Sequence, residues 1–310
     1  MAKITMKTAC LPTVEQIFSL WLSASAAKGV TDKTLETYRS HFQAIGKRLD
    51  ASLPIAELTT GILNGMILQM RQENLSDCSI SSYTRTLKVF LSWCNAEGYT
   101  KVNIPVFKAS ETVKETYSDE ELYILLKKPD ANCGFCEYRN WVIINFLLNS
   151  GCRAATVRNI QNQDVDLTRR QIILRHTKNR KTQLIPLCSS MVSILREYMA
   201  VREGGSTEYL FCSEFGEMLT ENALRLAIAK YNRSRGIERT SIHAFRHTFA
   251  RKYLVDCGGD AFMLQRLMGH STLKMTKHYC NLFNNDIVEN HDRFSPLAQL
   301  TRAKRQTIKR

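Results

Sequence analysis

Two motifs in the last third of the chain decide the fold: SIHAFRHT at residues 241–248 and LMGHS at residues 267–271. Tyr279 follows nine residues after His270. Histidines, an arginine and a tyrosine therefore stand at fixed offsets in a strongly basic protein. Cationic side chains can hold a phosphodiester, and a tyrosine hydroxyl can attack it. The combination predicts chemistry on a phosphodiester.

The first motif predicts the start of a helix. Thr240 and Ser241 form its cap, and His243 and Arg246 lie three residues apart. Residues at this spacing share one helical face, here near the N-terminus, where unpaired backbone N–H groups and the helix dipole favour an anion. We therefore expect His243 and Arg246 to face a common ligand.

The second motif predicts the end of another helix. Asp260 caps that helix, Gly269 ends it, and His270 lies in the turn. A further helix from about Thr272 carries Tyr279. Taken singly, His270 is more often a structural histidine and Tyr279 a half-buried aromatic residue. Their joint spacing with the first motif is what favours a functional interpretation.

An arginine and a hairpin precede these motifs. A very apolar helix over Asn140–Ser150 ends at Gly151, and Arg153 follows directly. Residues 171–175 and 183–187 are two short, mainly apolar runs on either side of a polar turn, which predicts a β-hairpin whose tip carries Lys178 and two further cations. A lysine on a hairpin tip is usually solvated. The functional alternative is that Lys178 reaches a bound phosphate.

The N-terminal part, residues 11–105, is wholly helical in pattern. Residues 13–16, TVEQ, have the spacing of a capping box, and we expect Asp32 to cap a second helix. Leu53–Met70 and Ser79–Tyr99 predict a third and a fourth helix. Polar residues around Pro105 break the pattern, so we expect a linker over residues 106–117. The basic residues of these helices include Lys33, Arg39, Lys47, Arg48, Arg71, Arg85 and Lys88.

Composition points to a polyanionic partner. The chain has 310 residues, a formal net charge of +14 and a pI near 9.4, which favours nucleic acid over a membrane surface. No run of eighteen apolar residues occurs, and the first residues lack the apolar segment of a signal peptide. We therefore expect a cytoplasmic, nucleoid-associated protein with double-stranded DNA as its partner and no membrane.

The cysteines do not form a metal-binding pattern. Ten are scattered through the chain, and Cys133 and Cys136 are the only close pair. A zinc ribbon needs a second pair, and a redox motif needs a βαβ context that the sequence lacks. We expect reduced thiols, no metal and no cofactor.

Taken together, the motifs resemble those of the tyrosine recombinase family, which includes phage integrases, transposon integrases and Xer-type enzymes. The match comprises Gly-Cys-Arg at 151–153, Thr-Lys-Asn at 177–179, the motifs at 243–247 and 267–271, and Tyr279. The resemblance implies a two-domain, mainly α fold. A helical, SAM-like core-binding domain (11–105) would follow a short extension (1–10). An α+β catalytic domain with a small antiparallel sheet (118–293) would precede a basic tail (294–310), which relatives exchange between protomers.

The resemblance also implies six catalytic residues: Arg153, Lys178, His243, Arg246, His270 and Tyr279. The tyrosine would attack a DNA phosphate and leave a 3′-phosphotyrosine link with a free 5′-hydroxyl. The two arginines would grip the phosphate, and the lysine would protonate the departing oxygen. The first histidine would assist proton transfer at the tyrosine, and the second would hydrogen-bond the phosphate. His247 would support this set.

The chain departs from the family pattern at one position, and a second position is expected to compensate. The family usually has an acid three residues after the first arginine, where this chain has Thr156. Asp164 stands where a second family acid is common, so we expect it to retain part of the support for Arg153. The chain begins at the core-binding helices, which favours simple core DNA sites without distant arm sites.

The implied activity is site-specific recombination, and the chain is expected to be the integrase of a mobile element. Four protomers would join two DNA sites as a homotetramer, with accessory or directionality proteins as possible partners. Two alternatives stay open: a type IB topoisomerase-like enzyme that relaxes DNA as a monomer, and a DNA-binding regulator that keeps the fold without catalysis. The full catalytic set argues against the regulator, and the Xer-like spacing argues against the topoisomerase.

Overall fold

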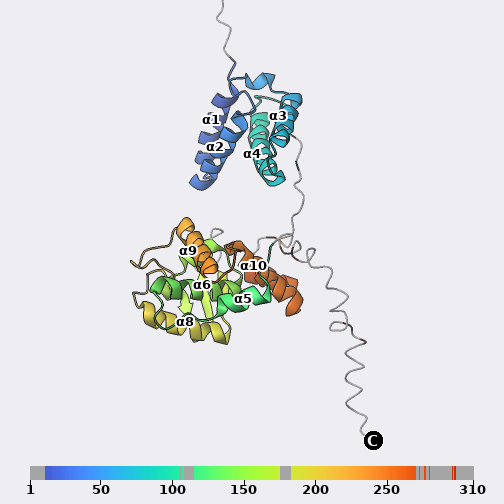
Figure 1. The fold of residues 1–310 in the computed structure, drawn as a ribbon. Coiled ribbons are helices and arrows are strands. Elements are labelled where there is room, and N and C mark those ends of the chain that lie inside the picture. The colour runs from blue at the N-terminus through green and yellow to red at the C-terminus, as the bar shows by residue number, and fades with distance from the viewer. Residues whose placement is uncertain are drawn as a thin grey trace, which may run out of the picture. The chain divides into compact units, whose positions relative to one another are not determined.

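The computed structural model describes residues 11–104, 107, 115–174 and 183–269, together with five single residues (272, 276, 279, 295 and 297). The chain divides into two compact units, Met1–Thr112 and Val113–Arg310. Within the described ranges, no helix is long and apolar enough to cross a membrane. Figure 1 shows the elements of each unit, which are described separately here.

The first unit is a small helical bundle. Its elements are α1 (Val14–Ala27), α2 (Asp32–Gly46), the 3₁₀ turn η1 (Ile55–Glu57), α3 (Thr60–Gln72) and α4 (Asp77–Ala96). Apolar positions at helical spacing bring α1, α2 and α4 together. Aromatic rings form the centre of this contact, where Phe18 of α1 stacks on Phe42 of α2 with centroids 3.7 Å apart. Phe90 of α4 meets the same Phe18 ring edge-on.

The predicted capping box at Thr13 is confirmed: its Oγ1 accepts from the N–H of Gln16, whose side chain accepts from the N–H of Thr13. Two other expectations for this unit were wrong. The residue that caps α2 is Thr31, and Asp32 is its first helical residue. The expected helix Leu53–Met70 is two elements, because Thr59 caps a new helix, accepting from the N–H of Ile62.

The second unit combines helices with one small sheet. Its elements are α5 (Asp119–Leu126), α6 (Phe135–Ser150), α7 (Ala154–Asn159), η2 (Asn162–Asp164), β1 (Val165–Asp166), β2 (Gln171–Leu174), β3 (Gln183–Pro186), α8 (Ser189–Arg202), α9 (Glu221–Ser234), α10 (Ile242–Arg251), the π-helical turn η3 (Lys252–Asp256) and α11 (Ala261–Met268). The predicted mainly helical fold with a small antiparallel sheet is confirmed.

The sheet contains the predicted hairpin and one further strand. β2 and β3 pair antiparallel with Ile172 opposite Ile185, and β1 adds to the other edge of β2 with Val165 opposite Ile172. Ile172 and Ile185 are buried, which fixes the register because a slip of one residue would expose them. The strand β1 was not expected from the sequence, since two residues give no periodic signal.

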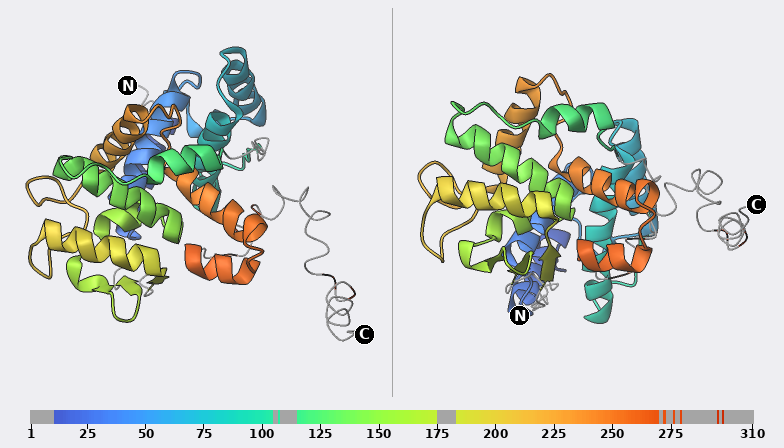
Figure 2. Two further views of the ribbon diagram at one scale, coloured as in Figure 1. Left: turned by 60° about the horizontal axis from the view of Figure 1, so that its bottom comes forward. Right: turned by 90° about the horizontal axis from the view of Figure 1, so that it is seen from below.

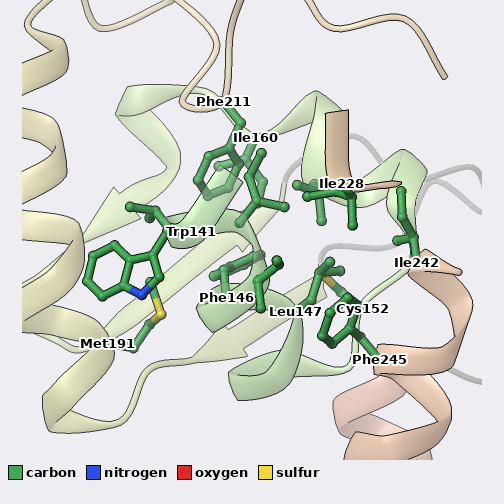
Figure 3. Close-up of a cluster of buried hydrophobic side chains, with 14 of the residues drawn as sticks. Trp141, Phe146, Leu147, Cys152, Ile160, Met191, Phe211, Ile228, Ile242 and Phe245 are labelled. Carbon is green, nitrogen blue, oxygen red and sulfur yellow. The ribbon is translucent and has the colours of Figure 1, made fainter. Parts of the chain in front are cut away.

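Helix α6 lies at the centre of the second unit. It begins at Phe135, earlier than the apolar run suggested, because Gly134 serves as its N-cap. Helices α5, α8, α9 and α10 all pack against it (Figures 1 and 2). Figure 3 shows the resulting apolar core, in which Phe245 of α10 lies beside Leu147 and Cys152 at the end of α6. This packing ties the first sequence motif to Gly151 and Arg153.

Candidate active site

The end of α6 places the first candidate residue. Gly151 adopts the left-handed conformation (φ 57°), and its N–H donates to the carbonyl of Leu147, which confirms the predicted helix stop. Arg153 then serves as the N-cap residue of α7. Its side chain is exposed, and Nη1 donates to the carbonyl of Gly269 at 3.3 Å.

Arg246 joins the ends of two helices. Its guanidinium is buried, with Nη1 donating to the carbonyl of Gly151 at 2.6 Å and Nη2 to the carbonyl of Met268 at 3.1 Å. Both carbonyls belong to helix C-termini, where backbone acceptors lack intrahelical partners and the dipole favours a cation. The structure therefore explains why a charged side chain is stable in this buried position.

The end of α11 brings the two arginines together. Asp260 caps the start of α11 by accepting from the N–H of Met263, and Gly269 ends it in the left-handed conformation (φ 62°), as the sequence predicted. The last two carbonyls then bind one arginine each, Met268 to Arg246 and Gly269 to Arg153. The two guanidinium groups thus converge on one helix end, although 93 residues separate them in the sequence.

Tyr279 lies against Arg246 and within the electrostatic reach of Arg153. Its side chain is only 5% exposed and packs in an apolar cluster with Ala250, Leu264 and Met268. Its hydroxyl hydrogen-bonds Arg246. Burial raises the pKa of Tyr279 above its usual value, and the positive charges of Arg246 and Arg153 act in the opposite direction.

The electrostatics of this cluster suit an anion. Burial lowers the pKa of Arg246, and the nearby charge of Arg153 lowers it further. Two neighbouring guanidinium groups repel each other, and a bound phosphate would relieve that repulsion while accepting hydrogen bonds from their N–H groups. A tyrosine beside such a phosphate has the geometry of a nucleophile next to its electrophile.

Among the described residues, His247 contacts Tyr279. Its Nδ1 lies 2.9 Å from the hydroxyl, and the two rings stand 5.6 Å apart at 45°. His243, expected to assist the tyrosine, is exposed one turn earlier on α10. The sequence placed His247 beside Arg246 and gave it only a supporting role. No local signal could have shown this contact, which depends on how α10 packs against Tyr279.

Two of the six predicted catalytic residues, Lys178 and His270, lie outside the described residues. The base of the hairpin is described, and Gln183 of β3 donates from Nε2 to the carbonyl of Leu267 on α11 at 3.3 Å. This bond ties the return strand of the hairpin to the helix whose end binds Arg153 and Arg246.

Asp164 does not support Arg153, contrary to our expectation. Its carboxylate accepts from the backbone N–H of Gln161 at 2.9 Å and closes the capping box of η2. Thr156, where the family usually has an acid, uses its backbone N–H to bond the carbonyl of Arg153 in the first turn of α7. Within the described residues, Arg153 is thus held through the backbone carbonyl of Gly269.

A buried tyrosine fixes α10 from the other side. The ring of Tyr117 stacks on Phe245 with centroids 4.2 Å apart, and its backbone N–H donates to Oγ1 of Thr248 at 2.8 Å. Its hydroxyl lies 3.2 Å from the carbonyl of Ser241 and accepts from Nδ2 of Asn232. The helix that carries Arg246 and His247 is therefore anchored at both ends.

Most of the cations singled out in the sequence of the first unit are exposed. Six of the seven predicted cations are exposed: Lys33, Arg39, Lys47, Arg71, Arg85 and Lys88. The side chain of the seventh, Arg48, is only 9% exposed and forms an ion pair with Glu73, so its charge is already neutralised. Dispersed exposed cations of this kind suit contacts with successive phosphates.

Comparisons with known proteins identify the family of the chain. The family model for the phage integrase family matches residues 116–286. Tyrosine recombinase XerC of Thermodesulfovibrio yellowstonii is 23% identical over 88% of this chain and 93% of its own length. XerC of Oceanobacillus iheyensis is 26% identical over 87% of this chain and 92% of its own length.

Two solved structures share the fold. The Tn1549 transposon integrase in complex with a circular intermediate DNA has a TM-score of 0.71 at 21% identity, covering 86% of this chain and 94% of that chain. A lambda integrase dimer bound to a COC′ core site has a TM-score of 0.69 at 20% identity, covering 85% and 97%. Since the family model spans more than half of the 310 residues, the chain belongs to the phage integrase family of tyrosine recombinases.

Proposed function

We propose that this protein is a site-specific DNA recombinase whose catalytic residues are Arg153, Lys178, His243, Arg246, His270 and Tyr279. The observation that carries the assignment is the contact of Tyr279 with Arg246 beside Arg153. A phenol held against one guanidinium group, with a second close by, can attack a phosphate that both groups bind.

The proposed reaction is an exchange of phosphodiesters. The oxygen of Tyr279 attacks phosphorus, the bond to the 5′-oxygen breaks, and the DNA is left with a 3′-phosphotyrosine and a free 5′-hydroxyl. Arg153 and Arg246 stabilise the additional negative charge of the pentacoordinate transition state. Lys178 protonates the departing 5′-oxygen, and His270 hydrogen-bonds the phosphate. His243 assists proton transfer at the tyrosine. Attack by a 5′-hydroxyl on the phosphotyrosine then rejoins the strand.

The same proposal gives each part of the chain a role. Residues 11–105 bind DNA through their exposed cations, residues 118–293 catalyse, and residues 106–117 connect the two domains. The basic tail, residues 294–310, is proposed to exchange between protomers; it lies outside the described residues except for 295 and 297. Lambda integrase has been seen as a tetramer on a Holliday junction, and we propose the same assembly here. A DNA-acting enzyme of this kind works in the cytoplasm.

Tyr279 contacts Arg246 and His247 of its own chain. We therefore propose that each protomer cleaves with its own tyrosine. Mixing the Tyr279→Phe variant with an Arg246→Ala variant tests this, because the mixture regains cleavage only if one protomer supplies its tyrosine to another. No adduct is expected from the mixture.

The proposed function is tested on a plasmid that carries the DNA flanking the gene, where an attachment site is expected. The protein is incubated with this DNA in EDTA without ATP and quenched with detergent. Covalent protein–DNA adducts are then measured. We expect an adduct that Tyr279→Phe abolishes without weakening DNA binding. Mapping the adduct gives the cleavage site.

Other outcomes would favour the alternatives. Bound DNA without any adduct would support a regulator that has lost catalysis. Relaxation of any supercoiled plasmid by monomers, without a preferred site, would support a topoisomerase. Retained cleavage by Tyr279→Phe would refute the nucleophile assignment.

A further inference from the structure

The structure gives Tyr279 a second partner besides Arg246. The Nδ1 atom of His247 lies 2.9 Å from the tyrosine hydroxyl, within ordinary hydrogen-bond distance. The contact joins two side chains 32 residues apart in the sequence. Both side chains are largely withdrawn from solvent, since Tyr279 is buried and His247 is half-buried.

The chemistry of the two partners indicates how the tyrosine proton is used. A guanidinium group carries only donors, so its bond with Tyr279 uses a lone pair of the phenol oxygen. The single phenolic proton stays available for another partner. An imidazole nitrogen that lacks a proton is an acceptor, and Nδ1 of His247 lies within hydrogen-bond distance of the phenol oxygen.

The position of His247 is fixed by its neighbours in α10. Arg246, one residue before it, is bound to the carbonyls of Gly151 and Met268. Thr248, one residue after it, donates to the carbonyl of Ala244 and accepts from the backbone N–H of Tyr117. A rigid backbone on both sides holds the imidazole at the tyrosine without requiring DNA, which is the preorganisation expected of a catalytic group.

We propose that His247 is a further catalytic residue, which accepts the phenolic proton of Tyr279 as the tyrosine oxygen attacks the phosphate. The inference rests on the proposed recombinase function. The proton moves from the phenol oxygen to Nδ1, the oxygen forms its bond to phosphorus, and the 5′-oxygen leaves with a proton from Lys178. When the strand is rejoined, the imidazolium returns its proton to the departing tyrosine oxygen. His243 assists from its exposed position.

The first test measures single-turnover cleavage of the mapped site at saturating DNA. We expect His247→Leu, which is close in size but lacks a proton acceptor, to cleave on the order of a hundredfold or more slowly, the usual contribution of a general base. Its dissociation constant for DNA should stay within about twofold. Cleavage at the rate of the unaltered protein would overturn the proposal.

A second test separates proton transfer from mere packing. A fluorinated tyrosine at position 279 has a phenol that ionises more readily, so it depends less on a base. We expect this replacement to shrink the deficit of His247→Leu severalfold. If the cleavage deficit of His247→Leu stays the same size, His247 has only a packing role. A substrate with sulfur at the 5′ leaving position should rescue Lys178→Ala and leave the His247→Leu deficit unchanged.

A third test needs no DNA and no activity, so it holds even if His247→Leu fails to fold. In protein with ¹⁵N-labelled histidine, Nδ1 of His247 should report a nitrogen that lacks a proton and accepts a hydrogen bond. Tyr279→Phe should shift that signal. A protonated Nδ1 on a neutral ring would overturn the proposal. Absence of any adduct with the unaltered protein would instead refute the recombinase function itself.

Discussion

Gly151 lies directly against the ring of Phe249. A Cβ atom added to Gly151 would stand 2.2 Å from Cδ1 and 2.8 Å from Cγ of that ring, and Gly151 has a φ of 57°. Atoms near the base of a ring cannot turn away as the tip of a side chain can. The approach lets α10 pack against the end of α6, which brings Arg246 to the carbonyl of Gly151.

The first prediction concerns Gly151→Ala. The left-handed conformation costs an L-residue roughly 1–2 kcal/mol, and overpacking costs about 1–3 kcal/mol more. We expect the free energy of unfolding in urea to fall by about the sum of the two, ~2–5 kcal/mol. Gly236→Ala is the matched control, since Gly236 also has a positive φ but nothing lies within 4 Å of an added Cβ. Equal losses in the two variants would contradict the role of Phe249.

Features that depend on neighbouring residues could be predicted from the sequence. The caps at Thr13 and Asp260 and the stops at Gly151 and Gly269 were all predicted and are all present. Each depends on a side chain or a φ angle within about four residues, so local chemistry decides it. The hairpin strands were predicted for the same reason, because short apolar runs and the polar turn between them are local.

Features that depend on packing could not be predicted. The sequence gave His247 only a supporting role, and no local pattern indicated its contact with Tyr279, because the rotation of α10 is set by Tyr117 and Phe245. The sequence also predicted that Asp164 supports Arg153, but its carboxylate accepts a hydrogen bond from the backbone N–H of Gln161, three residues away. The first contact depends on tertiary packing, whereas the second is a local cap that the family resemblance did not indicate.

The second prediction concerns the anchor of α10. Tyr117→Phe removes a buried hydroxyl that accepts from Asn232 and lies against the carbonyl of Ser241. Losing such a buried partner costs about 1–3 kcal/mol, which thermal or urea unfolding would measure. Tyr123→Phe is the control, because Tyr123 is 81% exposed and its hydroxyl is open to water in the folded protein. An unchanged stability in Tyr117→Phe would show that the hydroxyl contributes nothing to the anchor.

The third prediction concerns thiol reactivity and alkaline stability. Burial raises the pKa of Cys152 to about 11 and that of Cys94 to about 12, whereas Cys78, Cys188 and Cys257 are exposed. Since the thiolate is the reactive form, iodoacetamide at pH 8 should label Cys78, Cys188 and Cys257 and spare Cys152 and Cys94, as peptide mass spectrometry would show. Labelling of Cys152 at the rate of an exposed cysteine would contradict its burial.

The raised pKa values of Cys152 and Cys94 also determine how stability changes with pH. Above pH 9 the unfolded chain loses the protons of these thiols while the folded chain keeps them, so the unfolded state is favoured. The free energy of unfolding should therefore fall between about pH 9 and 11. Cys152→Ala should reduce that fall, and an unchanged pH profile would contradict the assignment.

The last prediction separates the two arginines, which the proposed mechanism treats alike. Arg246 is buried and binds the carbonyls of Gly151 and Met268, whereas Arg153 is exposed and makes one longer bond to Gly269. Arg246→Ala leaves buried acceptors unsatisfied and should cost about 2–4 kcal/mol of stability. Arg153→Ala should stay within about 0.5 kcal/mol of the unaltered protein. Both variants should lose several orders of magnitude in cleavage rate, because each removes a contact to the transition state.

Urea unfolding and single-turnover cleavage measure the two effects separately. Equal stability losses would show that Arg153 is as structural as Arg246, and near-normal cleavage by either variant would refute the shared clamp.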